Sequence, residues 1–496
     1  MSGTKSLVKD SAIYGGSTIL VRFVSWLMTT LLTYTLLETE FGMMNYLIAY
    51  TVLIRVILTF GMETGFFRFV NQADKNKVHT VYSTTLFIVG GIVLLFLSVF
   101  LIFLPEIRPV LWDKDAPINY IRLILIIVSL DAFSAIPFAY LRYQKRPVKF
   151  GTLQILYVVL YAVFCIFFLI VCPWINRHAP STIAWFWRED FRLGYVFISN
   201  LLATSIQSLC LISELTGFRY RFDAALAKKM FRYCFPLMLM GVAGMSNQVV
   251  DKFVFPRVYP DHANWSYELG IYNACFKIAM IMMMLMQAFS YAYEPFVFEK
   301  SKEKNSKQSY ADIMKYFVML GLLVFLGVMF YLDIIKYFIA PKFFSVPGAL
   351  NIVPVVLIAE LCFAVYFNLS IWYKLSDKTH WGTLFSVIGF VCIISLNILF
   401  IPKYSYHACA WAVLAGNGMM MLLSYFIEQK HYPIRYDLKT IAIYTGLAAG
   451  LFAVSSFIPI RSTGWHLGFN TVLIGIYIGV MLKRDLPLKM LWPRKA

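Results

Sequence analysis

Long apolar runs alternate with short polar segments along the whole of this chain. A helix needs about 20 predominantly apolar residues to cross a bilayer. Runs of this length give fourteen predicted spans, at residues 11–37, 42–66, 79–104, 117–141, 148–172, 191–213, 236–256, 268–292, 310–333, 347–372, 381–401, 405–427, 438–459 and 465–482. The longest segments between them leave no room for a soluble domain. The pattern therefore predicts an all-α polytopic membrane protein with fourteen transmembrane helices.

The composition supports this prediction. The chain is 60% hydrophobic and only 14% charged, whereas soluble domains are about 25% charged. Lys5 and Lys9 precede an apolar run of full spanning length, and no small-residue cleavage site follows it. This is typical of a retained first helix rather than of a removed signal peptide.

The distribution of Lys and Arg predicts the orientation of the chain. With the N-terminus inside, the inner segments carry 29 basic residues and the outer loops carry 11. Basic residues gather in cytoplasmic loops, so both termini are expected in the cytoplasm. The net charge of +18 then reflects membrane orientation, and it does not indicate nucleic-acid binding.

Four short sequence matches recur in the second half of the chain at nearly one spacing. The clearest is "EFGMMNYLIAY" from Glu40, which returns as "ELGIYNACFKI" from Glu268. The other three pairs are Asp131 with Glu360, Gly151 with Gly382, and Glu63 with Glu294, and all four spacings are 228–231 residues. Because this spacing equals six helices, an even number, equivalent helices run in the same direction. The halves are predicted to be parallel repeats, as in some transporters.

These repeats divide the chain into four predicted parts. Residues 1–215 form an N-terminal lobe of six helices, and residues 216–235 form a basic amphipathic linker lying on the inner leaflet. Residues 236–429 form the second six-helix lobe, and residues 430–496 hold two extra helices and a basic tail. Two parallel lobes with a cavity between them suit alternating access to a site at mid-membrane.

Helix 1 carries a polar stripe at steps of four and three residues, comprising Ser11, Gly15, Thr18, Arg22, Ser25 and Thr29. Arg22 lies eleven residues inside the span, about 16 Å at the helical rise. A charge at such a depth costs roughly 2.5–3.5 kcal/mol, so it normally faces a cavity or a partner. We interpret Arg22 as lining a cavity; the alternative is a structural seam between helices.

Two further cations lie inside predicted spans. Arg55 on helix 2 either lines the cavity or pairs with Glu63 or Asp131. Lys277 on helix 8 either lines the cavity or extends its ammonium group to the outer surface.

Helix 7, the repeat partner of helix 1, carries Asn247, Gln248, Asp251 and Lys252 at the depth of Arg22. Asp251 and Lys252 either line the cavity or mark an early end of this helix. Five acids therefore stand as candidates for a structural or an ion-coupling role, namely Glu63, Asp131, Asp251, Glu294 and Glu360. Buried carboxyls can pair with cations or bind H⁺ or Na⁺, and the sequence leaves both roles open.

The remaining residues do not suggest catalysis. The eight cysteines are scattered through apolar spans without a CxxC pair, and the seven histidines include no His-x-x-x-His pair. The chain has no Walker loop, dinucleotide fingerprint or nucleophile elbow. We expect neither a metal nor a cofactor, and no enzymatic activity.

Taken together, "SLVKDSAIYGGSTIL", "EFGMMNYLIAY", "GMETGFFRF", the six-plus-six repeat and the fourteen spans resemble one family. The chain is similar to the polysaccharide exporters and flippases of the multidrug/oligosaccharidyl-lipid/polysaccharide (MOP) superfamily, especially the Wzx-type O-antigen or polysaccharide-unit flippases. The resemblance implies a MATE-like fold in the bacterial inner membrane. It also implies transport of an undecaprenyl-diphosphate-linked glycan from the inner to the outer leaflet, with polysaccharide assembly machinery as a further partner.

The resemblance assigns roles to several candidates. Relatives line the cavity with Arg and Lys on helices 1, 2 and 8, the places of Arg22, Arg55 and Lys277 here. The polar stripes, with Thr18, Ser25, Asn247, Gln248 and Lys252, are then expected to bind the glycan.

Two alternatives remain. The drug-exporting branch keeps a cation site on helices 7 and 10, where Asp251 and Glu360 lie, so a drug or cation antiporter is the first. A membrane polysaccharide polymerase or ligase is the second, and it is disfavoured because the longest outer loop has only about eighteen residues.

Overall fold

A computed structural model describes residues 2–113, 116–300, 306–376, 378, 380–458 and 462–485. This part of the chain is helical, with no β-strand. Thirteen of its helical segments are long and apolar enough to cross a membrane. They are Gly15–Thr35, Glu38–Gln72, Val78–Ile102, Ile118–Tyr143, Pro147–His178, Glu189–Glu214, Trp265–Phe289, Ser306–Phe330, Ala349–Tyr373, His380–Tyr404, Tyr406–His431, Leu438–Phe457 and Gly464–Arg484. The predicted all-α polytopic fold is confirmed, and the long helix Ala224–Val258 occupies the place of the seventh predicted span.

The helices group by their contacts into two units. Unit 1 comprises Met1–Asn273 and Ile394–Tyr406, and unit 2 comprises Ala274–Ile393 and His407–Ala496. The helices up to the first unit boundary are α1 (Ser2–Thr35), α2 (Glu38–Thr59), α3 (Met62–Gln72), α4 (Val78–Ile102), α5 (Leu104–Leu111), α6 (Ile118–Tyr143), α7 (Pro147–Ile166), α8 (Cys172–His178), α9 (Pro180–Ile183), α10 (Arg192–Cys210), α11 (Ala224–Val258) and α12 (Trp265–Lys300).

The later helices are α13 (Ser306–Phe330), α14 (Leu332–Ile335), α15 (Pro341–Phe344), α16 (Ile352–Leu369), α17 (Ile371–Leu375), α18 (His380–Tyr404), α19 (Tyr406–His431), α20 (Leu438–Phe457) and α21 (Thr463–Arg484). The boundary between the units passes through α12 and α18, and again after Tyr406, the first residue of α19. The grouping differs from the predicted lobes because α11 packs on α2, α3 and α4 and so belongs to unit 1.

The second predicted span is interrupted, where the sequence predicted one continuous helix. Phe60 has φ 51° and Gly61 has φ 68°, both in the left-handed region. Only glycine adopts this region freely, so Gly61 allows the chain to turn between α2 and α3. The turn also lies close to α11, since a Cβ atom at Gly61 would be 3.2 Å from the Cys234 carbonyl oxygen.

The predicted linker is not a separate element in its second half. From Ala224 onward it belongs to α11, which begins at an N-cap where Asp223 Oδ1 accepts a hydrogen bond from Leu226 N at 2.9 Å. The face of this helix carrying Met230 and Cys234 is fully buried in the core formed with α3, α4 and α6. The buried face, and not the Phe222 and Phe231 side chains, which are exposed, therefore positions the start of α11.

The repeated phrases meet where α2 and α12 cross, within unit 1. A Cβ atom at Gly42 would overlap the carbonyl oxygen of Ser266 and would lie 2.8 Å from Gly270 N. A Cβ atom at Gly270 would overlap the Glu38 carbonyl oxygen and would lie 3.2 Å from Gly42 N. The two contacts are reciprocal, because the pairs Gly42–Gly270 and Glu38–Ser266 are each 228 residues apart. Such reciprocity is what a two-fold relation between repeats produces, and glycine permits this approach of two backbones.

The same local bond recurs on both helices. Asn45 Nδ2 donates to Phe41 O at 2.8 Å on α2. Asn273 Nδ2 donates to Leu269 O at 2.7 Å on α12. Both asparagines are buried, so each turns its amide back onto its own helix and leaves the crossing free of unpaired donors.

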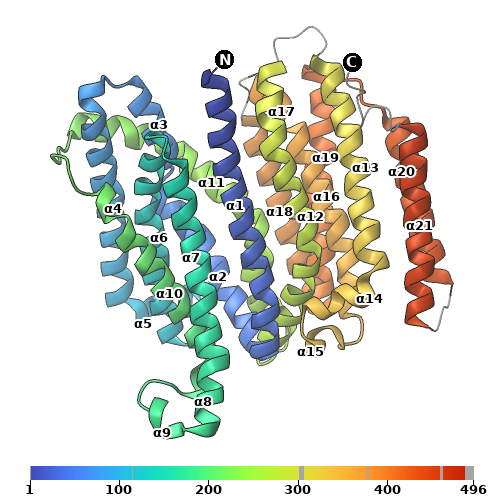
Figure 1. The fold of residues 1–496 in the computed structure, drawn as a ribbon, viewed down its shortest axis with the longest axis horizontal. Coiled ribbons are helices and arrows are strands. Elements are labelled where there is room, and N and C mark those ends of the chain that lie inside the picture. The colour runs from blue at the N-terminus through green and yellow to red at the C-terminus, as the bar shows by residue number, and fades with distance from the viewer. Residues whose placement is uncertain are drawn as a thin grey trace. The chain divides into compact units, whose positions relative to one another are not determined.

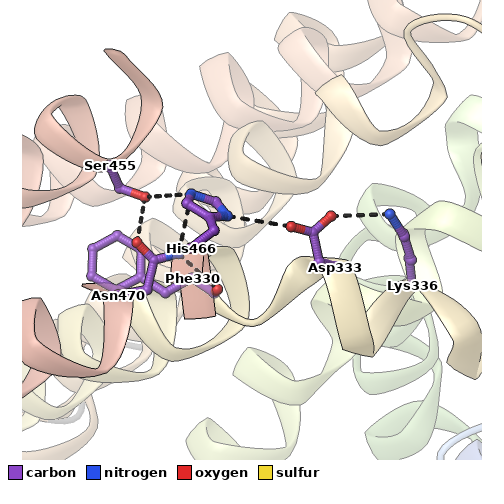
Figure 2. Close-up of polar contacts among 6 residues, drawn as sticks. All are labelled: Phe330, Asp333, Lys336, Ser455, His466 and Asn470. Carbon is purple, nitrogen blue, oxygen red and sulfur yellow. Dashed lines mark hydrogen bonds and ion pairs between the residues drawn. The ribbon is translucent and has the colours of Figure 1, made fainter. Parts of the chain in front are cut away.

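Within unit 2, the last two helices, α20 and α21, pack on α13 (Figure 1). Figure 2 shows the polar contacts at one end of this arrangement. Asn470 is fully buried, donates to Phe330 O at 3.0 Å and accepts from Ser455 Oγ at 2.7 Å. His466 Nδ1 lies 3.4 Å from Asp333 Oδ2, and Lys336 Nζ lies 3.0 Å from Asp333 Oδ1. These bonds fix where α21 begins against the end of α13.

We expect alanine at Gly42 or Gly270 to destabilise unit 1, because each new methyl group meets backbone atoms that cannot rotate away. Overpacking of this kind costs about 1–3 kcal/mol. Gly244→Ala is the matched control, since a Cβ atom there meets nothing within 4 Å. Thermal unfolding of the purified variants is the measurement. Equal melting temperatures for the Gly42→Ala and Gly244→Ala proteins would contradict the close crossing.

Asp333 gives a prediction about acid stability. The hydrogen bond from Lys336 lowers the pKa of the Asp333 carboxyl below its ordinary value. A carboxyl with a lowered folded pKa contributes stability above about pH 4, and this contribution is lost as the pH falls through the folded pKa. Between about pH 5 and pH 3 the melting temperature of the wild type is therefore expected to fall more steeply than that of Asp333→Asn. If the melting temperatures of the wild type and of Asp333→Asn fell equally with pH, the pairing of Asp333 with Lys336 would contribute nothing to stability.

Candidate functional site

On α1, the polar stripe is only partly exposed in unit 1. Arg22 and Ser25 are exposed, Thr18 is half-buried, and Thr29 is buried. Arg22 makes no hydrogen bond and no ion pair within the described part of the chain. The middle of the stripe thus presents a charged side chain at the surface of unit 1 without a protein partner. The side chain of Ser11 lies outside the described residues.

Arg55 lies on α2, which packs against α6. Its side chain is exposed, and its charge acts on the half-buried carboxylate of Asp131 on α6. Arg55 has no partner within ion-pair distance in the described chain. Glu63 and Asp131 were the two acids predicted as partners for Arg55, and its charge acts on Asp131.

Glu63 is paired elsewhere. Its Oε2 atom lies 2.8 Å from Arg142 Nη2, and the Arg142 guanidinium also stacks 5.1 Å from the centre of the Phe67 ring. Glu63 therefore holds the end of α6 against α3. The side chain of its repeat partner, Glu294, lies outside the described residues.

A polar cluster around Asp131 was not predicted from the sequence. Tyr157 on α7 donates to Asn200 Oδ1 on α10 at 3.1 Å, and Thr204 Oγ1 donates to the same atom at 3.2 Å. Tyr161 stacks parallel to Tyr157, with ring centres 6.4 Å apart. The cluster could have been found from its i, i+4 spacing on two apolar helices, namely Tyr157 with Tyr161 and Asn200 with Thr204.

Asp251 and Lys252 neutralise each other on α11. Lys252 Nζ lies 3.1 Å from Asp251 Oδ1 and 3.2 Å from Oδ2, and the two side chains are 14% and 4% exposed. The helix continues to Val258, so the alternative of an early helix end is wrong. Nearby, Asn247 is buried and donates to Ala243 O at 3.4 Å, while Gln248 is exposed.

Two candidates belong to unit 2. Lys277 is half-buried on α12, and Glu360 is buried on α16. Unit 2 also contains an apolar groove with a volume of about 600 Å³. It is bordered by α13, α16, α19 and α20, and its lining includes Phe325, Leu361 and Phe452.

In the described part of the chain, no three His, Cys, Asp or Glu side chains lie close enough to hold a metal ion.

The cations on α1 and α6 give opposite expectations for stability. Arg22→Ala should leave the melting temperature of the protein unchanged, because the guanidinium contacts no hydrogen-bond or ion-pair partner among the described residues. Arg142→Ala should destabilise the fold by about 0.5–2 kcal/mol, since it removes both an ion pair and a cation–π contact. Thermal unfolding in detergent distinguishes them. A loss in Arg22→Ala as large as that in Arg142→Ala would mean that Arg22 is a structural residue.

Sequence comparison matches residues 7–299 of this chain to the family model of polysaccharide biosynthesis proteins. A second family model, MatE, matches residues 262–399. Among curated proteins, no sequence matches the chain.

Solved structures share the fold over nearly the whole chain. The lipid II flippase MurJ in an inward closed conformation is 13% identical, with a TM-score of 0.73, covering 96% of this chain and 99% of that one. An inward-facing multidrug resistance MATE transporter of the MOP superfamily is 12% identical, with a TM-score of 0.66 over 87% and 96%. An outward-facing one is 14% identical, with a TM-score of 0.57 over 89% and 96%. The fold of these transporters is thus the fold of this chain.

Proposed function

Because this multi-pass membrane protein belongs to the polysaccharide biosynthesis protein family, we propose that it is a flippase for a lipid-linked glycan. The proposed substrate is an undecaprenyl-diphosphate-linked repeat unit of O-antigen, capsule or another polysaccharide. It moves from the inner to the outer leaflet of the bacterial inner membrane. The Lys and Arg distribution supports an orientation with both termini in the cytoplasm.

The single observation that carries the proposal is that the charges of Arg22 and Arg55 are exposed and uncompensated in the described part of the chain. Both lie inside spanning segments, and both side chains are exposed in unit 1 with no ion-pair partner among the residues that the structure describes. A cation at this depth is costly unless something compensates it. An anionic ligand would do so, and charge-assisted hydrogen bonds from guanidinium groups to phosphate oxygens are among the strongest available.

The other parts of the substrate have matching surfaces. Thr18, Ser25 and Gln248 offer hydroxyl and amide groups for the sugars, with Asn247, Lys252 and Lys277 as further candidates. The polyprenyl chain is apolar and stays in the bilayer during transport.

We propose that the crossing of α2 and α12 is the element that opens and closes during transport. In the predicted orientation the N-terminal ends of both helices lie at the outer face. We propose alternating access in which separation at Gly42 and Gly270 opens the cationic cavity outward. An inside-negative potential favours outward movement of the diphosphate, by roughly 2.3 kcal/mol per charge per 100 mV.

An ion can be coupled to this cycle. Asp131 is the acid that we propose first for H⁺ or Na⁺, because Asp251 is neutralised by Lys252 at 3.1 Å and Glu63 by Arg142 at 2.8 Å. Glu360 stays a further candidate from its place in the repeat, opposite Asp131. Contact with polysaccharide assembly machinery is proposed from family membership alone.

A drug or cation antiporter is the second candidate function. The match of residues 262–399 to the MatE family model, which includes Glu360, favours it. An antiporter requires its carboxylates to be indispensable, whereas the flippase requires its guanidinium groups. The two functions therefore predict that different substitutions abolish transport.

The test uses a bacterial strain that lacks its own flippase and expresses this chain. Arg22→Ala and Arg55→Ala should each reduce outer-leaflet delivery of the lipid-linked unit at least about tenfold, the value of one charged hydrogen bond. Arg177, which is exposed in the last turn of α8, is the matched control, and Arg177→Ala should transport normally. Delivery is measured by accessibility of the glycan to an external enzyme.

Normal delivery in both the Arg22→Ala and Arg55→Ala strains would remove the proposed site. Loss of drug efflux in Asp251→Asn and Glu360→Gln, with efflux intact in Arg22→Ala, would establish the antiporter instead.

A further inference from the structure

A basic hollow lies on the turn between α6 and α7 of unit 1, at the ends of their spanning segments. It has a volume of about 550 Å³, and its lining includes Lys145, Arg146, Lys149 and Thr152. Arg22 and Arg55 lie inside their spans, whereas these residues lie at the membrane boundary. In the predicted orientation this boundary faces the cytoplasm.

In the part of the chain that the structure describes, the cations that line the hollow outnumber Glu214, the acid that two of them contact. Glu214, only 4% exposed, has Oε1 at 2.6 Å from Lys149 Nζ and at 3.5 Å from Arg146 Nη1. Arg142 adds no free charge, since it is bound to Glu63. One carboxylate therefore faces three cations, counting Lys145. The surplus gives the hollow affinity for an anion.

Lys149 and its partner Glu214 are held in place before any ligand arrives. Lys149 Nζ also donates to Ser213 Oγ at 2.8 Å. The Glu214 carbonyl accepts from Tyr82 at 3.0 Å, which fixes the acid. Lys145 has φ 54°, a left-handed conformation that directs the turn between α6 and α7. Side chains fixed in this way lose less entropy on binding than free surface lysines.

An apolar track runs from the hollow along one face of α7. Exposed side chains follow helical spacing on this face, comprising Val148, Thr152, Val159, Val163 and Ile166. A soluble phosphate would use only the cations, but a phospholipid would use the track as well. Basic pockets on the cytoplasmic side of helical membrane proteins suit anionic lipid headgroups for this reason.

We infer that this hollow binds the headgroup of an anionic phospholipid of the inner leaflet, with an acyl chain lying along α7. The lipid joins the ends of α6, α7 and α10 by completing the charge balance around Glu214. It is a resident ligand and not the transported substrate, so the inference stands apart from the proposed flippase function.

Native mass spectrometry of the delipidated full-length protein tests this inference, with titration of phosphatidylglycerol and phosphatidylethanolamine. The wild type should retain phosphatidylglycerol preferentially. Lys145→Asn should bind it about fivefold more weakly, the share of one lysine at an anionic surface. Asparagine is chosen because it tolerates the left-handed backbone. Lys77→Asn, which alters an exposed cation next to Asp74, is the control and should bind normally.

Glu214→Gln is expected to change phosphatidylglycerol binding in the opposite direction to Lys145→Asn. It therefore distinguishes a lipid-binding site from an ion pair with a purely structural role. Removing the carboxylate should strengthen phosphatidylglycerol binding severalfold, because it leaves the cations uncompensated. Weaker binding in Glu214→Gln protein that still unfolds cooperatively would overturn the inference. So would equal losses in Lys145→Asn and Lys77→Asn, or displacement of the lipid by millimolar inorganic phosphate.

Discussion

The close approach of α2 and α12 at Gly42 and Gly270 is the constraint on which this account depends. Backbone meets backbone there, so neither position has room for a side chain. The contact is reciprocal between positions 228 residues apart, which explains why the chain repeats one phrase. A contact made by equivalent surfaces of two repeats can open symmetrically, and that is the property that an alternating-access transporter requires.

Electrostatics then distinguishes the candidate charges. Asp251 is neutralised by Lys252, Glu63 by Arg142 and Glu214 by Lys149, within distances of 2.6–3.1 Å. Arg22 has no such partner in the described chain, and Arg55 acts on Asp131 through its charge without an ion pair among the described residues. Structural charges are thus paired locally, while the two guanidinium groups inside the first spans are kept available. This contrast, rather than the number of buried charges, favours an anionic substrate.

The sequence predicted the fold class and most helix positions because apolar runs of spanning length are an unambiguous signal. It did not predict the break at Phe60 and Gly61, since a single glycine inside an apolar run carries little information about backbone angles. It placed a linker at residues 216–235 because basic residues dominate there. The small buried face with Met230 and Cys234, which makes this segment part of α11, is recognisable only once α3 and α4 are seen to cover it.

At the site, the sequence identified the charged residues but not their pairing. Spacing along one helix cannot show that Glu63 meets Arg142 and not Arg55, because the partners come from different helices. The i, i+4 spacing of Tyr157 with Tyr161 and of Asn200 with Thr204 indicated two polar faces, but not that Tyr157 and Asn200 meet across α7 and α10. What the sequence did supply was the repeat, and the crossing glycines give it a physical basis.

The most direct test of the central claim is a distance measured between the N-terminal ends of α2 and α12 while the protein works. Spin labels at Thr39→Cys and Asn264→Cys, both exposed positions, report it by double electron–electron resonance in reconstituted vesicles. The account predicts a short distance and a second, longer distance whose population changes when lipid-linked glycan is supplied. A single unchanging short distance in labelled protein that still transports would contradict it.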